Sequence, residues 1–147
     1  EGESATEAER WIRRELRPRG QPPFLCVLGG ETTVSVGSAQ GLGGPSQEFA
    51  LAGARALAAH RAAHPRDSRR FVLLTFSTDG VDGPTDAAGA IVTDTTWNDI
   101  KRLGIDPDLA LKNHDSHRAL NNVGALIRTG PTGTNVNHIA ALMVYAS

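Results

Sequence analysis

The chain has 147 residues, a net charge of −1 and an apolar fraction of 39%. A chain of this length can bury a core of its own, and this composition excludes a disordered protein. The near-neutral charge does not favour binding to nucleic acid, and no apolar run reaches the roughly 20 residues of a membrane span. We therefore expect neither nucleic acid nor a membrane as a partner. The single cysteine, Cys26, excludes an internal disulfide framework and favours a reducing, cytoplasmic location.

The sequence also suggests how this chain is organised. It opens on Glu1 and contains one methionine, Met143, so we expect it to be part of a longer chain. Residues 1–20 are expected to form an N-terminal helix and an inter-domain linker. Residues 21–147 are expected to form a single domain at the C-terminal end of a two-domain protein.

The first elements in chain order are a helix and two short strands. Apolar residues at helical intervals predict a helix over residues 5–16, ended by Pro18 and Gly20. The apolar run 24–28 predicts a buried strand. The β-branched, alternating run 31–36 predicts a second strand directly after it.

The middle of the chain predicts one long helix and one buried strand. The alanine-rich segment 47–63 is typical of a long helix. The continuous apolar run 71–76 predicts a strand that is buried on both faces. Residues 87–93 fit either a short strand or a helical turn.

The last third of the chain predicts short helices between strands. Helices are expected over 95–103, 107–113 and 115–122, and a strand over 125–128. The apolar run 139–145 fits a strand or a buried helix, and its short length favours the strand. Because helices and strands alternate, we expect an α/β fold with a small mixed β-sheet flanked by helices.

Three loops rich in glycine, hydroxyl and carboxylate groups each follow a predicted strand, over residues 37–47, 77–86 and 129–135. Ligands in α/β proteins collect beyond the ends of strands, where backbone amides and helix N-termini are free. The first loop matches neither a phosphate-binding P-loop nor a dinucleotide fingerprint, so an anion site and a plain flexible turn both remain open.

The second loop places three carboxylates, Asp79, Asp82 and Asp86, within eight residues. Clustered carboxylates with flanking waters are suitable ligands for Mg²⁺. The alternative is structural: Asp79 and Asp82 would form Asx turns and Asp86 would cap a helix.

Five motifs together resemble a known family. They are GGETTV at 29–34, GLGGPSQEFAL at 41–51, TDGVDGPTDAAGA at 78–90, HDS at 114–116 and TGPTGTNVN at 129–137. In this order they closely resemble the C-terminal MOFRL domain of the glycerate 2-kinase family, whose bacterial members are often named hydroxypyruvate reductases.

The resemblance implies an enzyme that transfers the γ-phosphoryl group of ATP to the 2-hydroxyl of D-glycerate, with Mg²⁺. The active site of such an enzyme lies in a cleft between this domain and a Rossmann-like N-terminal domain, and the partner is a small hydroxy acid. The implied catalytic residues are Glu31, Asp79 and Asp82, the two aspartates also serving as metal ligands. The implied substrate- and phosphate-binding residues are Thr32, Thr33, Gly43, Gly44, Gln47, Glu48, Thr78, Asp115, Ser116, Thr132, Gly133, Thr134 and Asn135.

Four positions depart from the family motifs. Pro45 and Ser46 stand where the family pattern has arginine and asparagine, His114 replaces an asparagine, and His138 replaces an aspartate. The chain is therefore interpreted in two ways. It is either one half of a kinase that is inactive alone, or a degenerate or stand-alone MOFRL domain that binds a small anion or a protein without catalysis. An NAD(P)H-dependent hydroxypyruvate reductase is a third alternative, but no dinucleotide fingerprint supports it.

Overall fold

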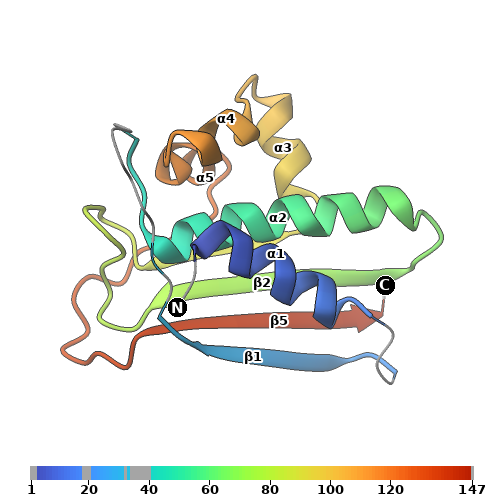
Figure 1. Cartoon of the computed structure of the whole chain (residues 1–147), viewed down its shortest axis with the longest axis horizontal. Helices are drawn as coiled ribbons and strands as arrows, with labels where there is room; N and C mark the ends of the chain where they lie inside the picture. The colour runs from blue at the N-terminus through green and yellow to red at the C-terminus, as the bar shows by residue number, and fades with distance from the viewer. Residues whose placement is uncertain (1–2, 18–20, 32, 34–40, 147) are drawn as a thin grey trace.

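A five-stranded sheet with the strand order β1-β5-β2-β3-β4 forms one layer of the computed structural model (Figure 1). The structure describes residues 3–17, 21–31, 33 and 41–146. The strands are β1 (Phe24–Gly30), β2 (Arg69–Ser77), β3 (Gly89–Thr93), β4 (Leu126–Ile127) and β5 (His138–Ala146). Each pair of neighbouring strands in this sheet is antiparallel.

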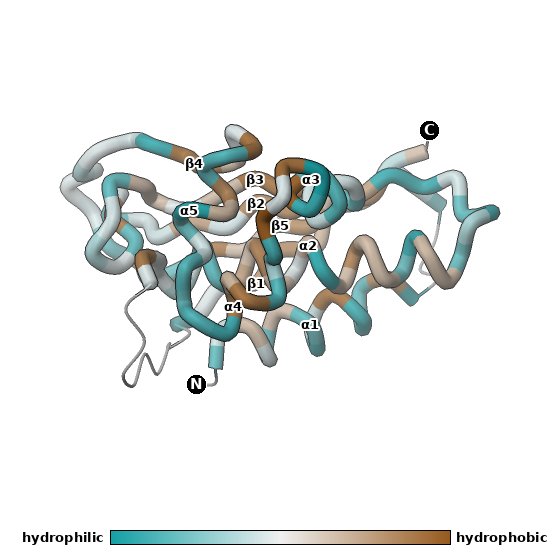
Figure 2. The backbone as a smooth tube through the Cα atoms, turned by 90° about the horizontal axis from the view of Figure 1, so that it is seen from above, coloured by the Kyte–Doolittle hydropathy of each residue, from teal (hydrophilic) through white to brown (hydrophobic). Residues whose placement is uncertain are grey.

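The helices form a second layer against one face of the sheet. They are α1 (Ser4–Glu15), α2 (Pro45–Ala63), α3 (Thr96–Arg102), α4 (Pro107–Lys112) and α5 (Ser116–Asn122). Helix α2 packs on β2 and β3, and α1 packs on α2. In Figure 2 these two helices lie on the same side of the strands. None of the described helices is both long enough and apolar enough to cross a membrane.

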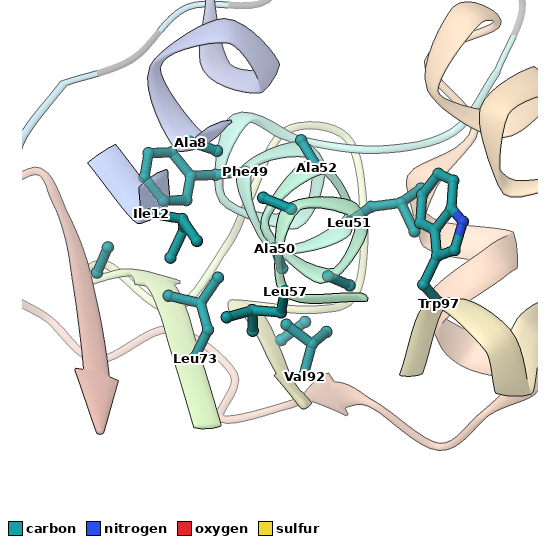
Figure 3. Close-up of a cluster of buried hydrophobic side chains, with 14 of the residues drawn as sticks. Ala8, Ile12, Phe49, Ala50, Leu51, Ala52, Leu57, Leu73, Val92 and Trp97 are labelled. Carbon is teal, nitrogen blue, oxygen red and sulfur yellow. The ribbon is translucent and has the colours of Figure 1, made fainter. Parts of the chain in front are cut away.

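Helix α2 is the centre of the hydrophobic core. Leu51 and Leu57 are fully buried, and apolar residues occur around most of the helix circumference, as expected for a helix enclosed by protein. Figure 3 shows Ile12 of α1, Leu73 of the sheet and Trp97 of α3 arranged around α2. Helix α1, which lies within the predicted linker segment 1–20, therefore contributes to the core. The predicted boundary between linker and domain stays a prediction.

The α/β class and most predicted elements are confirmed. The helix predicted over 47–63 begins at Pro45, because proline is favoured in the first turn of a helix, where no amide donor is needed. The undecided segment 87–93 contains strand β3. The predicted strand over 31–36 falls mostly outside the described residues.

Two predictions about burial were wrong. The strand over 24–28 was expected to be buried, but the residues of β1 are half-buried or exposed, because β1 is an edge strand of the sheet. Strand β2 was expected to be buried on both faces, but its residues alternate between buried and half-buried. Phe71 and Leu73 point into the core, whereas Val72 and Leu74 point to the other face of the sheet. The reason is topological: an antiparallel sheet can leave one face uncovered, while parallel crossovers would have placed helices on both faces.

The register of the sheet brings the three polar loops to one edge. Gly30 at the end of β1 and Ser77 at the end of β2 both pair with His138 at the start of β5. Gly89 at the start of β3 lies opposite both Phe76 and Ile127. The segments that leave these positions all emerge on the side where α2 begins, which is the left edge of Figure 1.

Candidate functional site

Asp82 joins the second loop to the start of α2. Its Oδ1 accepts a hydrogen bond from the amide of Ser46 at 2.9 Å, and its Oδ2 accepts one from the amide of Gln47 at 2.8 Å. The Gln47 side chain donates a third, from Nε2 to Oδ2, at 2.9 Å. A carboxylate from another loop therefore satisfies amides that the first turn of a helix leaves unpaired.

Burial raises the pKa of Asp82, and the hydrogen bonds from Ser46 and Gln47 oppose this shift. The side chain is 1% exposed, and both of its oxygens are engaged by protein donors. Asp82 was predicted as a catalytic residue and a metal ligand. Its geometry is that of a helix cap, while a role in catalysis or metal binding stays a prediction.

The glycines before α2 allow close contacts with the second loop. A Cβ atom on Gly44 would lie 2.4 Å from the backbone carbon of Asp82, and one on Gly43 would lie 2.3 Å from Ser116 Oγ. A Cβ atom on Gly83, which has φ +62°, would lie 2.7 Å from the carbonyl oxygen of Gly43. The amides of α2 that could hold a phosphate are thus already directed at Asp82. Phosphate binding by Gly43, Gly44 and Gln47 stays a prediction.

Asp79 differs from Asp82 because only one of its two carboxylate oxygens accepts hydrogen bonds from the described residues. Its Oδ1 accepts hydrogen bonds from the Val81 amide at 3.0 Å and the Ser77 hydroxyl at 2.9 Å. The first contact is the predicted Asx turn. These two donors lower the pKa of Asp79, so it is a carboxylate at neutral pH. Among the described residues none donates to its Oδ2, which leaves that oxygen open to a ligand.

Thr78 and Thr132 hold the third loop against the second. Thr78 Oγ1 accepts from the Val136 amide at 2.7 Å and donates to the Asn137 carbonyl at 2.8 Å. The Thr132 hydroxyl donates to the Thr78 carbonyl, and its amide donates to the Asp79 carbonyl. Both predicted binding residues thus use polar groups to join the loops. The predicted Gly133, Thr134 and Asn135 are exposed on the third loop.

We expect Thr78→Val to loosen the third loop. Removing the hydroxyl leaves the Val136 amide without its acceptor, which costs about 1–2 kcal/mol of local stability. Amide exchange at Val136 should then rise about tenfold, measured by hydrogen–deuterium exchange. Thr129→Val is the control, because within the described part of the chain the Thr129 hydroxyl donates only to the carbonyl of the next residue. Equal exchange rates in the two variants would contradict this role of Thr78.

A second group of predicted residues lies beside α5. Buried Glu48 accepts a hydrogen bond from His114 Nδ1 at 2.8 Å, and burial raises the pKa of this glutamate. Asp115 Oδ1 accepts from the Leu42 amide at 3.3 Å. Ser116 is fully buried, and its Oγ has no hydrogen-bond partner in the described part of the chain. These contacts fix the position of the 41–44 segment over α5.

Asp86 forms an ion-paired cluster on the surface. Its Oδ1 lies 2.7 Å from His117 Nε2, and its Oδ2 lies 2.7 Å from Arg128 Nε. The sequence alternative in which Asp86 caps a helix is therefore wrong. The physical reason is that an imidazole from α5 and a guanidinium from the start of the third loop fold onto this carboxylate.

Arg128, and then His117, lower the pKa of Asp86 to about 2. The ionised form is favoured in the folded chain, so this contribution to stability is present above the ordinary value of 3.8 and is lost as the pH falls towards 2. We expect an NMR titration of Asp86 to show a midpoint near 2 and Arg128→Gln to move it towards 3.8. Arg118→Gln serves as the control, since the ion pairs of Asp86 with described residues are to His117 and Arg128 and not to Arg118. An unchanged midpoint in Arg128→Gln would contradict the assignment.

A cavity of about 360 Å³ lies at the same edge, between α1, the end of β1 and the starts of α2 and β5. Ser46 and His138 line it, and Ser46 Oγ and His138 Nδ1 are buried without a hydrogen-bond partner among the described residues. Gly29 and Gly30 leave room beside them. Buried polar atoms in a native site are usually paired, so these two atoms are candidate contacts for a small polar ligand.

The outer part of the cavity is charged. Glu31, predicted as catalytic, lines the cavity together with Glu7 and Arg10 of α1. Arg10 lies 3.4 Å from Glu7 in an exposed ion pair. Among the described residues that were predicted as site residues, only Glu31 therefore lines the cavity. The cavity is also lined by residues of helix α1, which lies in the segment predicted as N-terminal helix and linker.

The family model that matches this chain is the MOFRL family, over residues 24–138. The chain belongs to the MOFRL family. The matched range includes the second and third loops, the described part of the first, and the sheet residues that bring them together.

Relatives of this MOFRL chain include two named kinases. The glycerate 2-kinase of Pyrococcus horikoshii is 46% identical over 136 residues, which is 90% of this chain and 29% of the relative. The D-glycerate 2-kinase of Thermotoga maritima is 44% identical over 141 residues, 92% of this chain and 32% of the relative. The chain thus spans about a third of the length of these relatives.

Solved structures share the fold. A crystal structure of a Pyrococcus horikoshii protein matches 99% of this chain and 33% of its own, with a TM-score of 0.83 and 42% identity. The crystal structure of glycerate kinase from Thermotoga maritima matches 97% of this chain and 34% of its own, with a TM-score of 0.82 and 41% identity.

The MOFRL motifs thus lie together at one edge of the sheet, but their side chains fall into two groups with different roles. Asp82, Thr78 and Glu48 hold the protein together, whereas Asp79 and Glu31 retain groups that a ligand could reach. Thr33 forms a bridge with Glu3 beside α1, and Thr32 lies outside the described residues. No group of three or more histidine, cysteine, aspartate or glutamate side chains in the described chain could hold a metal by itself.

The contribution of His138 was not predicted from sequence. It was noted only as a departure from a motif, and Arg10, Glu7 and Thr75 of the cavity were not predicted as site residues. A weak signal did exist, because Ser46 and His138 both replace residues of the family motifs and both line this one cavity.

Proposed function

We propose that this MOFRL chain is the C-terminal domain of a glycerate 2-kinase and forms one wall of the cleft in which ATP phosphorylates D-glycerate. The supporting observation is the match to the family over residues 24–138, together with the relatives named glycerate 2-kinase at 46% and 44% identity. The other wall would be a Rossmann-like domain that precedes this chain, consistent with relatives about three times as long.

Phosphoryl transfer depends mainly on positioning and on neutralising charge, with little covalent chemistry for the protein to perform. In this proposal the loop edge supplies a rigid surface. Asp82 holds the start of α2 in place, and Thr78 holds the third loop. The isolated chain is expected to be inactive, since half of the cleft lies outside it.

Asp79 fits a role in holding Mg²⁺. It is a carboxylate at neutral pH, and its Oδ2 accepts no hydrogen bond from the described residues. Mg²⁺ takes few protein ligands and keeps waters and phosphate oxygens as the others, so one carboxylate at the edge is compatible with such a site. When bound, the ion would neutralise charge on the ATP phosphates. Asp82 fits less well because its oxygens are already engaged.

The cavity beside the loops is the place we propose for the hydroxy acid. Ser46 Oγ and His138 Nδ1 can contact a substrate hydroxyl, since each lacks a hydrogen-bond partner within the described residues. Arg10, at the outer part, carries the positive charge suited to a carboxylate.

The test is an assay of the full-length protein with MgATP and D-glycerate. We expect formation of phosphoglycerate with ATP consumed in equal amount. Omitting Mg²⁺ should abolish the reaction. If the full-length protein forms no phosphoglycerate under any of these conditions, the proposal is wrong.

A degenerate domain that binds an anion without catalysis is the second candidate, and Pro45 favours it. Proline carries no charge and no amide donor at the first turn of α2, where an arginine would bind oxyanions through two parallel hydrogen bonds. Pro45→Arg in the full-length protein separates the two. A gain of about tenfold or more in the rate of phosphoglycerate formation supports a kinase weakened at this position. No gain, with wild-type activity absent, supports the binding domain.

A further inference from the structure

The face of the sheet opposite α1 and α2 is apolar, and we call it the outer face. Two rows of side chains cross it: Leu25, Met143 and Val72 in one, and Val27, Leu74 and Ile91 in the other. Several of these are well exposed, with Val27 at 64%, Leu25 at 58% and Ile91 at 44%. An antiparallel sheet that faces water normally alternates apolar with polar residues, so this outer face is not built for solvent.

The outer face also lacks acidic residues. In the four long strands its positions hold apolar, glycine and threonine residues, with Arg70 as the only charge, at the rim opposite Tyr145. Arg70 lies 3.6 Å from the buried carboxylate of Asp94. Covering the face would therefore remove apolar surface from water without burying an unpaired carboxylate, and two such faces would not repel each other.

The size of the outer face suits a protein partner. Strands about 4.8 Å apart with a rise of about 3.4 Å per residue give a flat face of about 500 Å² in projection. Side-chain relief increases the accessible area further, towards the ~800 Å² per partner of a standard interface. This extent lies in the upper part of the ~300–600 Å² range of the largest apolar patch on a typical monomer, and such patches often mark an interaction site.

The way the chain enters the domain indicates which partner covers this face. The Ser4 amide donates to the Thr33 carbonyl at 2.9 Å, and the Ser4 hydroxyl donates to the Pro45 carbonyl. Helix α1 thus starts at the loop edge and within the helix layer. A preceding domain joined there would face the loops, as the proposed function requires, and not the outer face. This step rests on the proposed function.

We propose that the outer face is the contact between two copies of this protein, which stack sheet on sheet about a two-fold axis. Two flat apolar sheets pack face to face at about 10 Å with their strands about 30° apart, and interdigitating side chains fill the space. A two-fold contact uses the same surface on both copies, so the outer face needs only to be complementary to itself.

The experiment measures the mass of the full-length protein by light scattering during size-exclusion chromatography, with phosphoglycerate formation assayed in parallel. The wild type should have twice the mass of one chain. Val27→Lys and Leu25→Lys should each halve it, because a lysine in the contact buries an unpaired charge. These side chains are more than half exposed in the single chain, so lysine is compatible with the fold, and tryptophan fluorescence checks this.

Leu103→Lys and Leu109→Lys are the matched controls. These leucines are 57% and 51% exposed, and they lie outside the sheet. Both control variants should keep the mass of the wild type. If Val27→Lys fails to fold, Leu25→Lys at the start of β1 carries the test. A wild type with the mass of one chain overturns the proposal, as does a folded outer-face variant with unchanged mass. Either result can occur with or without phosphoglycerate formation, so failure of the dimer and failure of the kinase are distinguished.

Discussion

Replacing Asp82 with alanine is expected to destabilise the domain by about 3–5 kcal/mol, because the change removes a buried acceptor with several donors. The amides of Ser46 and Gln47 and the Gln47 side chain would lose their partner together. A helix cap alone is worth about 0.5–2 kcal/mol, and the rest comes from buried donors that water cannot reach.

The effect can be measured by unfolding of the chain. Trp11 and Trp97 are the two tryptophans of the sequence, and both are 5% exposed, so their fluorescence reports the loss of the core. At about 2–4 °C per kcal/mol for a chain near this size, the thermal midpoint should fall by about 6–20 °C. Asp82→Asn keeps one acceptor oxygen and should lie between the wild type and Asp82→Ala.

Asp106→Ala is the control for Asp82→Ala. Asp106 caps α4 by accepting from the amides of Asp108 and Leu109, but it is exposed to solvent. Water can replace it, so the cost should be near 1 kcal/mol. Similar losses in Asp82→Ala and Asp106→Ala would mean that burial of the Asp82 contacts contributes nothing, contrary to the account given above.

Under the proposed kinase function, replacing Asp79 with asparagine is expected to lower kcat of the full-length protein by about 10²–10³, the loss typical when one group that stabilises developing charge is removed. Asparagine keeps an oxygen that can accept from the Ser77 hydroxyl and the Val81 amide. The fold should therefore be retained, and the thermal midpoint should stay close to that of the wild type. What is lost is the negative charge at Oδ2, which a cation would need.

The measurement is the rate of phosphoglycerate formation at varied Mg²⁺ and saturating D-glycerate. Asp79→Asn should need more Mg²⁺ to reach half of its own maximal rate. Asp99→Asn, an exposed aspartate of α3 whose ion pair is to Arg102, should leave the rate unchanged. If Asp79→Asn retained the wild-type rate at every Mg²⁺ concentration, Asp79 would have no part in the reaction.

Much of the local structure of the site could be predicted from the sequence. The motif at 78–90 placed Asp79 in an Asx turn, and glycines at 80 and 83 marked tight turns. Such turns depend on contacts two residues apart, so the local sequence contains the information. The role of Asp82 as a cap of α2 could not be predicted in this way, because the amides that donate to it lie about 35 residues earlier, at the start of α2.

The sequence by itself determined the α/β class, the long helix α2 and the apolar strand β2, and it favoured a strand over a buried helix for β5, because periodicity and turn residues act within a few positions of one another. Only the tertiary structure decided the rest. The pairing of Gly30 and Ser77 with His138 gathers three loops at one edge and places His138 and Ser46 along the same cavity. The same antiparallel register leaves Val27 and Ile91 on an uncovered face, because which side the helices occupy depends on contacts between distant segments and not on any local pattern.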